Sequence, residues 1–225
     1  MRFNLLIVFS IIFPVTCLFA QETQPTCANN IGICPNEGCS SDNHHDPKLN
    51  VIKNIISNNK PIADRSLSWM RSHKNPKKFT EYSPQGSRGK LTELGEGDQI
   101  RTVGYLLAVK PELGGESCNC YLRTVEETDN HLVLVTKETL EKYPLPMNAS
   151  KSILRTTFRF REKESVTAEF TPRVRKEHPN FTNAKLQPLI NKTPQGALLV
   201  RITGQLMFDS EHYFVHKLSR VNNWE

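Results

Sequence analysis

Cys118 and Cys120 stand one residue apart in the segment ESCNCYL. In an extended strand, such residues point the same way, with Cβ atoms about 6.5 to 7 Å apart. A disulfide needs about 3.8 Å between its Cβ atoms, so a mutual bridge is disfavoured, whereas two thiolates on one metal ion fit the spacing. His131, on the following predicted strand, is a candidate third ligand, and mixed cysteine and histidine sets suit zinc or copper.

The cysteine pair also has plainer interpretations. Cys-x-Cys without a second close pair is a weak metal signal. We therefore favour two buried thiols, or one thiol bridged to Cys27, Cys34 or Cys39. Zinc at Cys118, Cys120 and His131 is kept as the alternative, and zinc is the candidate cofactor.

Two further histidines are predicted at the ends of strands, where sites often form. His178 lies in KEHPNF and His212 in DSEHY. Either could complete a metal site, and a carboxylate close to His212 in sequence, Asp209 or Glu211, would suit acid–base chemistry. The alternative is that these histidines are simply solvated or hydrogen-bonded.

Arginines alternate with apolar residues in two segments, RTTFRFR and TPRVRK. A period of two places Arg159 with Arg161, and Arg173 with Arg175, on the polar face of predicted strands. Phosphate groups bind such rows of cations, and surfaces of OB-type barrels add aromatic stacking. The alternative is a solvated strand face balanced by neighbouring glutamates.

The composition narrows the class of protein. The 225 residues include 29 Lys and Arg, 23 Asp and Glu, and six cysteines. This mildly basic balance permits contact with nucleic acid or envelope polymers without requiring it. The sequence contains no phosphate loop, nucleophile elbow, HExxH or CxxC motif, which favours a binding protein over an enzyme.

The N-terminus predicts export. Arg2 precedes an apolar run over 5–19, and Ala20 offers a small residue before a polar segment, which indicates a signal peptide over 1–20. The exported chain is expected to be secreted or periplasmic, without an integral membrane segment, because no second long apolar stretch follows. A lipid anchor at Cys17 is the alternative.

The rest of the chain is predicted to divide into three parts. Residues 21–45 form a polar, cysteine-bearing arm, residues 46–98 a short helix near 47–58 followed by a long loop, and residues 99–225 a strand-rich domain.

The strand-rich domain contains one helical pattern, at 182–191, which Pro188 shortens or kinks. Strands are predicted at 99–110, at 120–125, at 130–138, in a hairpin over 152–174, at 197–209 and at 218–225. Three strand groups, a short helix and two strands is the order of an OB-type barrel. The sequence therefore predicts a mostly-β, OB-like five-stranded Greek-key barrel with one short helix between strands three and four, preceded by a short N-terminal helix. Other Greek-key sandwiches are an alternative.

Several segments carry a resemblance. ESCNC, the later His131, ESVTAEFTPRVRKEHPNF, VRITGQLMFDSEH and the closing Trp-Glu resemble small secreted bacterial proteins with an OB-fold-like domain and no established activity. The similarity covers residues 46–56 and 98–225, about two-thirds of the exported chain. These proteins usually continue past Trp-Glu with isoleucine, histidine and proline, whereas this sequence stops at Glu225. The resemblance implies the barrel fold rather than an activity.

Together these observations predict an extracytoplasmic OB-like binding module. Its ligand is expected to be anionic, a nucleic acid or envelope polymer, or else a protein partner, bound through Arg159, Arg161, Arg173, Arg175, His178 and His212. The first alternative is a zinc-type, metal-dependent hydrolase of phosphodiesters that draws its ligands from the cysteines and histidines above. The second is a structural part of an envelope complex, with the loop at 73–98 as an interaction arm.

Overall fold

The computed structural model describes residues 27–39, 47–55, 59–76, 88–113, 115–210, 212 and 220–225. The signal peptide predicted over 1–20, the alternative lipid site at Cys17 and residues 77–87 of the predicted loop lie outside the described residues. What the sequence suggests for these segments therefore stays a prediction.

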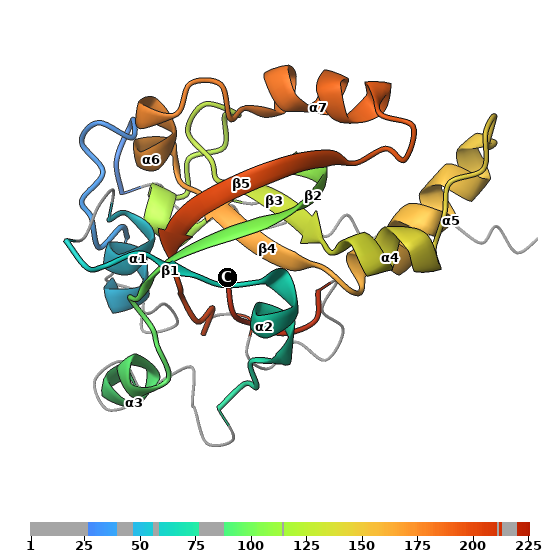
Figure 1. Ribbon diagram of the computed structural model, residues 1–225. Coiled ribbons are helices and arrows are strands. Elements are labelled where there is room, and N and C mark those ends of the chain that lie inside the picture. The colour runs from blue at the N-terminus through green and yellow to red at the C-terminus, as the bar shows by residue number, and fades with distance from the viewer. Residues whose placement is uncertain are drawn as a thin grey trace, which may run out of the picture.

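A mixed five-stranded sheet forms the centre of the protein (Figure 1). Its strands are β1 (Ala63–Asp64), β2 (Gln99–Pro111), β3 (Asn130–Val135), β4 (Val166–Phe170) and β5 (Leu198–Gln205). β2 pairs antiparallel with β3 and β5 and parallel with β1, and β4 pairs antiparallel with β3. The sheet therefore depends on β2, which is bonded to three other strands.

The sequence of β2 accounts for this central place. Buried and more exposed residues alternate over its first half, and all four residues from Leu106 to Val109 are buried in its second half. The register against β3 shifts between Leu106 and Ala108, which is the mark of a β-bulge. Gly104 allows a helix to pack closely here, because a Cβ atom at this position would lie 2.2 Å from Leu67 Cδ1.

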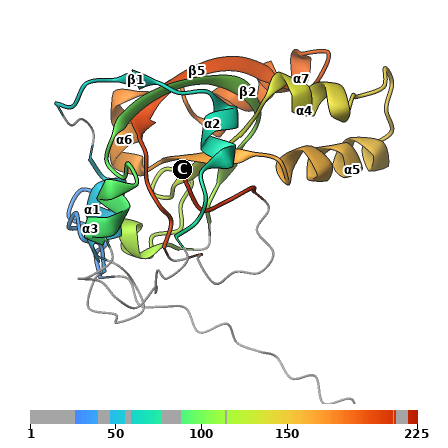
Figure 2. The same cartoon turned by 60° about the horizontal axis from the view of Figure 1, so that its bottom comes forward.

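The helices of the described residues surround the sheet. They are α1 (Pro47–Lys53), α2 (Leu67–Ser72), α3 (Arg88–Glu93), the 3-10 turn η1 (Ser117–Asn119), α4 (Lys137–Lys142), α5 (Lys151–Glu162), α6 (Pro172–Glu177) and α7 (Asn183–Lys192). In Figure 1, α6 and α7 lie above the strands and α2 below them, while Figures 1 and 2 both show α4 and α5 projecting from one end. None of these helices is long and apolar enough to cross a bilayer.

Several helices begin at a side chain that caps them. At four N-termini, the hydroxyl of a serine or threonine accepts a hydrogen bond from the backbone N–H three residues later; these caps are Ser66, Thr136, Ser150 and Thr171. Such caps satisfy backbone donors that the first helical turn leaves without partners. The start of each of these helices is therefore encoded locally.

One apolar core joins the sheet to α2, α7 and the C-terminal segment. Leu106 and Leu132 from the sheet, Met70 from α2, Ile190 from α7 and Trp224 belong to it. A smaller cluster packs α4 against β2 and β3. The packing confirms the predicted helix at 182–191 and the predicted strands at 99–110 and 197–209, which correspond to α7, β2 and β5. The short helix predicted near 47–58 corresponds to α1.

The hairpin predicted over 152–174 is wrong in its first arm. This stretch forms α5, and only the second arm is a strand, β4. On a helix, residues two apart lie about 200° apart, so Phe158 packs against the small core cluster while Phe160 stays exposed. The alternation in RTTFRFR does not mark a strand, because no described strand pairs with this segment.

The strand predicted at 120–125 is also wrong, and the barrel is not confirmed. Cys120 and Tyr121 adopt positive φ angles of 55° and 60°, which turn the chain instead of extending it. The five strands form a sheet that does not close. The predicted last strand is reduced to a bridge between Phe208 and Trp224, with backbone bonds that include one from Val221 N–H to the carbonyl of Ser165.

Two disulfides fix the N-terminal arm: one closes a loop within it and the other attaches it to the body. Cys27 is bridged to Cys39, and Cys34 is bridged to Cys120 across 86 positions. In the chain-entropy model, a crosslink over such a loop stabilises the fold by about 4.6 kcal/mol. Gly38 allows the close contact, because a Cβ atom there would lie 2.0 Å from the carbonyl oxygen of Ser117. A bridge from the Cys118 and Cys120 pair to the arm is one of the plainer interpretations favoured above.

Candidate functional site

Charged side chains from four parts of the chain meet beside β3 and β4. His131 on β3 and Glu169 on β4 are direct partners in the sheet register, which places both side chains on one face. Glu116 reaches them from the loop between β2 and β3, and Lys53 from the last turn of α1. We call these four residues the His131 cluster.

His131 faces one oxygen of each carboxylate in the cluster. Its Nε2 atom lies 3.2 Å from Glu169 Oε1 and 3.8 Å from Glu116 Oε1. This buried nitrogen makes no hydrogen bond within the described structure. The other ring nitrogen, Nδ1, lies 3.9 Å from Glu112 Oε2. The imidazole therefore has carboxylates on both sides.

Lys53 contacts the remaining oxygens of the same two carboxylates. Its Nζ atom lies 2.8 Å from Glu169 Oε2 and 3.7 Å from Glu116 Oε2. The side chains of Lys53 and Glu169 are only 3% and 5% exposed. A single charge at this depth costs several kcal/mol unless it is paired, so the cluster helps to hold α1 against the sheet.

A second row of polar groups supports Glu116. Cys118 Sγ lies 3.3 Å from Glu116 Oε2 and 3.5 Å from Asp129 Oδ2. Asn119 donates a hydrogen bond of 2.8 Å to the other oxygen of Asp129. Asn50 of α1 donates to Ser117 Oγ at 3.1 Å. The loop that presents Glu116 is thus fixed on two sides.

The charges of the cluster determine one another. Burial alone would raise the pKa of Glu169, but Lys53 and His131 hold that pKa well below its usual range. Burial also opposes ionisation of Glu116, yet Lys53 lowers its pKa. Burial would lower the pKa of His131, but Glu169 and Glu116 raise it to about 9. At neutral pH the cluster therefore holds two negative and two positive charges.

Asp129 and Cys118 both hold their protons more tightly than usual. Burial raises the pKa of Asp129 well above its usual range, and the charge of Glu116 adds to this effect. Burial likewise raises the pKa of Cys118, together with the nearby Asp129 and Glu116. A nucleophilic cysteine requires a thiolate. Cys118 is therefore an inert buried thiol, one of the plainer interpretations of the sequence.

The predicted zinc set of Cys118, Cys120 and His131 does not assemble. Cys120 is bridged to Cys34, and a disulfide sulfur is not a thiolate ligand. The prediction assumed an extended pair, whereas the turn after η1 sends the two side chains to different partners. A different set comes together around His131: one atom each from Glu116, His131 and Glu169, all within 4.8 Å of one another.

Three of the four predicted arginines bind main-chain carbonyl groups of the protein itself. Arg161 is buried and donates to the carbonyls of residues 143 and 195. Arg173 donates to those of residues 34, 35 and 118, and Arg175 to those of residues 125, 126 and 128. Arg159 is exposed on another side of α5. The row of cations predicted on a strand face is therefore wrong.

The other two predicted site histidines lie apart from the cluster. His178 is exposed at the end of α6 and contacts the ring of Phe170. His212 Nδ1 lies 2.6 Å from Asp209 Oδ2, one of the two carboxylates that stand near it in the sequence. Burial would raise the pKa of Asp209, but His212 and Arg220 lower it to about 2. Neither histidine joins His131 in any described group close enough to share an ion.

Sequence reasoning found His131 but missed its partners. Glu116 stands two residues before Cys118, and Glu169 occurs in the apolar context TAEF, where a carboxylate is unusual. Lys53 ends an amphipathic helix and has no local signal. The pairing of β3 with β4 decides which carboxylate faces His131.

The cluster lies outside two surface hollows that the described residues form. One hollow is lined by residues that include Tyr105, Leu140 and Pro194, and the other by residues that include Lys60 and Trp69. No member of the His131 cluster lines either of them. The cluster opens to solvent through His131 itself, whose side chain is 18% exposed.

Comparisons with protein-family models, curated proteins and solved structures return no match for this chain.

The arginine contacts lead to a prediction about stability. Arg175→Gln is expected to lower the free energy of unfolding by about 2–4 kcal/mol, because it leaves the buried carbonyl of Thr128 and two partly buried carbonyls without their donor. Arg159→Gln, the matched control on exposed α5, should change it by less than about 0.5 kcal/mol. Urea unfolding followed by circular dichroism measures both. Equal stability of the two variants would show that Arg175 is not a structural side chain.

A second prediction concerns pH. With a chelator present, the free energy of unfolding should fall as the pH rises from 6.5 to about 9, because the proton on His131 is held more tightly in the folded state. Glu169 and Glu116 hold that proton, Glu112 adds to them and Lys53 opposes them. The stabilisation is fully present below pH 6.5 and amounts to about 3 kcal/mol, since tenfold in proton affinity is about 1.4 kcal/mol.

Urea unfolding between pH 6 and 9.5 measures this effect. His131→Gln should flatten the curve over that range, and His178→Gln, the exposed control, should leave it unchanged. An unaltered curve in His131→Gln would contradict the assignment.

Proposed function

We propose that this protein is an extracytoplasmic binding module that holds one divalent metal ion between Glu116, His131 and Glu169. The open side of the ion would take an anionic ligand group. The proposal rests on one observation: a ring nitrogen and two carboxylate oxygens, from three separate elements, converge within 4.8 Å of one another.

The spacing of these atoms suits a metal ion. Ligand atoms that lie about 2.0–2.2 Å from a metal stand about 3.0–3.5 Å from one another. His131 Nε2 lies 3.2 Å from Glu169 Oε1 and 3.8 Å from Glu116 Oε1. Without an ion the two carboxylates hold a proton on the ring, and a divalent cation would take the place of that proton between the same atoms. Imidazole with carboxylate suits zinc among the common metals.

The surroundings support the same role. Metal-binding histidines commonly direct their second ring nitrogen toward a carboxylate, as Nδ1 of His131 does toward Glu112. Lys53 Nζ contacts the Oε2 atoms of Glu116 and Glu169, whereas His131 faces the Oε1 atoms. The ammonium group and an ion can therefore use different oxygens of the same carboxylates.

The charge of the occupied site indicates the ligand. With a divalent ion bound and His131 neutral, two carboxylates and Lys53 leave a net positive charge of one. A carboxylate or phosphate group would neutralise this charge. The metal would thus take over the role that the sequence suggested for the arginine row.

The architecture supports an OB-type relationship, which we propose on the strand order. β2, β3 and β4 are followed by α6 and α7 and then by β5, which returns to β2. The C-terminal segment contacts residues next to two of these strands. Trp224 forms a bridge with Phe208, which follows β5, and Val221 N–H donates to the carbonyl of Ser165, which precedes β4. OB domains bind ligands on strands two and three and the loop between strands one and two. The His131 cluster occupies the corresponding place, and this argument is one of analogy between folds.

The disulfides support the proposed compartment. Four of the cysteines form two bridges, and bridges of this kind persist in oxidising, extracytoplasmic settings. The predicted signal peptide agrees with this location.

Metal analysis tests the proposal. The protein purified without chelator should carry about one equivalent of metal, and the stripped protein should bind Zn²⁺ with a rise in melting temperature. Glu116→Gln and His131→Gln should each weaken binding by about 100-fold, since loss of even an outer-shell partner costs about 10–100-fold. Glu141→Gln, on the exposed face of α4, should bind as the unaltered protein does.

Two outcomes would end this proposal. One is a metal content below about one tenth of an equivalent, with no titratable site after stripping. The other is Zn²⁺ binding that Glu116→Gln and His131→Gln leave unchanged while their circular dichroism spectra show a native fold.

A metal-dependent hydrolase is the second candidate function. Catalytic zinc sites keep three protein ligands and one open position, and the cluster offers three ligands at a solvent-facing edge. The Zn²⁺-loaded protein should then hydrolyse bis(p-nitrophenyl) phosphate, and His131→Gln should abolish the activity. Stoichiometric Zn²⁺ binding without any turnover would leave only the binding module.

A further inference from the structure

We propose that α4, α5 and the loop between them form an arm that lies on an anionic membrane surface. The arm comprises residues 137–162. It shares no residue with the His131 cluster, so this inference stands independently of the metal site.

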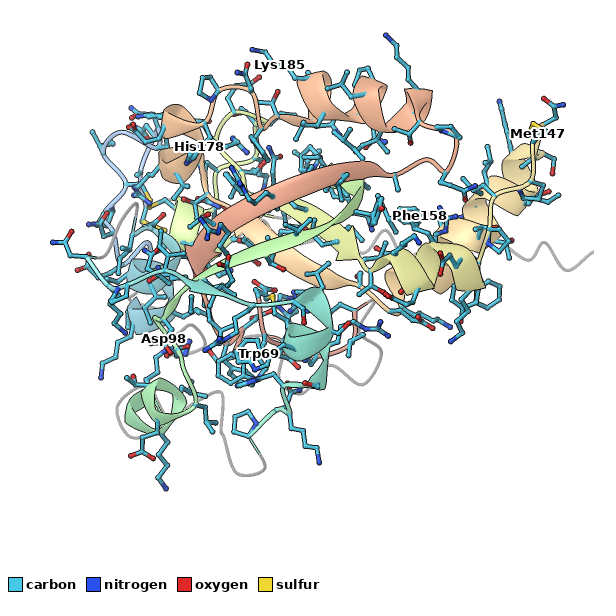
Figure 3. All side chains as sticks on the ribbon, in the orientation of Figure 1. Trp69, Asp98, Met147, Phe158, His178 and Lys185 are labelled. Carbon is cyan, nitrogen blue, oxygen red and sulfur yellow. A yellow bond between two sulfur atoms is a disulfide. The ribbon has the colours of Figure 1, made fainter. Side chains whose placement is uncertain are left out.

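The arm projects from the body of the protein. Figures 1 and 2 show α5 extending from the end of the sheet, and Figure 3 places Met147 at its far end. Met147 is 95% exposed, which is rare for a large apolar side chain. A contact surface at this tip can reach a flat partner before the rest of the molecule does.

Apolar side chains are exposed along the arm. Ile153 and Phe160 lie seven residues apart, so they share one face of α5, while Leu154 is exposed about 100° further round the helix. Phe160 is 48% exposed although one side of its ring stacks on Tyr143. Together with Met147 at the tip, Ile153 and Phe160 form an apolar edge, and exposed apolar groups that gather in one place mark an interaction surface.

Cations line the opposite side of the same helix. Lys151, Arg155 and Arg159 follow one another at intervals of four residues, and all three are exposed. Glu162, the acidic residue of α5, pairs with Lys110 and does not neutralise this row. α5 therefore presents a basic row on the side opposite its apolar edge.

This combination favours an anionic bilayer as the partner. Helices that lie in a membrane interface place Lys and Arg on one face and large apolar side chains on the other. A nucleic acid would use the cations but would leave Met147, Ile153 and Leu154 in water. Anionic headgroups with acyl chains beneath them satisfy both faces at once.

The base of the arm holds it in position. Glu164 accepts hydrogen bonds from Tyr143 Oη at 3.0 Å and from Thr139 Oγ1 at 3.2 Å. Arg161 donates to the carbonyl of Tyr143 at 2.8 Å. The arm is thus formed before contact, and binding requires little further ordering of the chain.

A tryptophan on the arm reports contact with lipid directly. Phe160→Trp should show a blue-shifted emission with vesicles containing phosphatidylglycerol, and brominated lipids should quench it. Leu189→Trp, on exposed α7, is the matched control and should show neither effect. The full chain is used throughout, so contributions from other segments are equal in both proteins.

Charge and apolar variants then separate the two faces. Arg155→Gln with Arg159→Gln should reduce partitioning onto these vesicles about 25-fold, since each cation near such a surface contributes about fivefold. Ile153→Ser with Leu154→Ser, introduced into the Phe160→Trp protein, should remove the blue shift of its emission. The control Lys185→Gln with Lys192→Gln on α7 should change neither.

Three results would overturn the proposal. The first is Phe160→Trp emission that is unchanged by the anionic vesicles. The second is equal partitioning of the charge variant. The third is a dimer in sedimentation velocity that Ile153→Ser with Leu154→Ser dissociates in the absence of lipid, which would assign the apolar edge to a second copy of the chain.

Discussion

Two carboxylates and two cations are buried together beside β3 and β4, and none of them is stable there without the others. Lys53 with Glu169 is the most deeply buried pair. α1 has only seven residues, too few for a stable isolated helix. Its position depends on Lys53 and on the hydrogen bond from Asn50 to Ser117. The need for local neutrality therefore joins α1, the loop between β2 and β3, and the sheet into one unit.

Long connections in this fold are organised by guanidinium groups rather than by further strands. Arg175 donates hydrogen bonds to three carbonyls of the loop between β2 and β3. Arg173 donates to carbonyls of the N-terminal arm and of the same loop, and so joins the two. Arg161 donates to the carbonyls of residues 143 and 195, and so joins the base of the arm formed by α4 and α5 to the segment before β5. Each supplies several donors where the backbone has no regular partner. The chain thus obtains rigid loops from a small sheet.

The sequence predicted the elements whose patterns are local. β2 and β5 follow from their apolar runs, and α7 from the spacing of Leu186 and Ile190. α5 was missed because phenylalanine and arginine alternate over 158–161, as apolar and polar residues do in a strand. Only the absence of a pairing strand excludes that interpretation. The extended geometry predicted for Cys120 is wrong, because a cysteine in the sequence does not indicate a left-handed backbone conformation.

The candidate site was only partly predictable for a related reason. His131 was identified as a ligand on the correct strand, but its partnership with Glu169 exists only once β3 and β4 are in register. Lys53 is brought in by tertiary packing from 78 positions away in the sequence. Residues that meet through strand pairing and tertiary packing have no characteristic spacing in the sequence, whereas the residues of a loop motif do.

The bridge between Cys34 and Cys120 has a consequence for biosynthesis. A polypeptide that crosses a membrane N-terminus first delivers Cys27, Cys34 and Cys39 to the oxidising side well before Cys120. Of the three crosslinks that these thiols can form, the one between Cys27 and Cys39 is native, and the two that use Cys34 are not. A chain that forms either of the latter must exchange it after Cys120 arrives, which is the reaction that a disulfide isomerase catalyses.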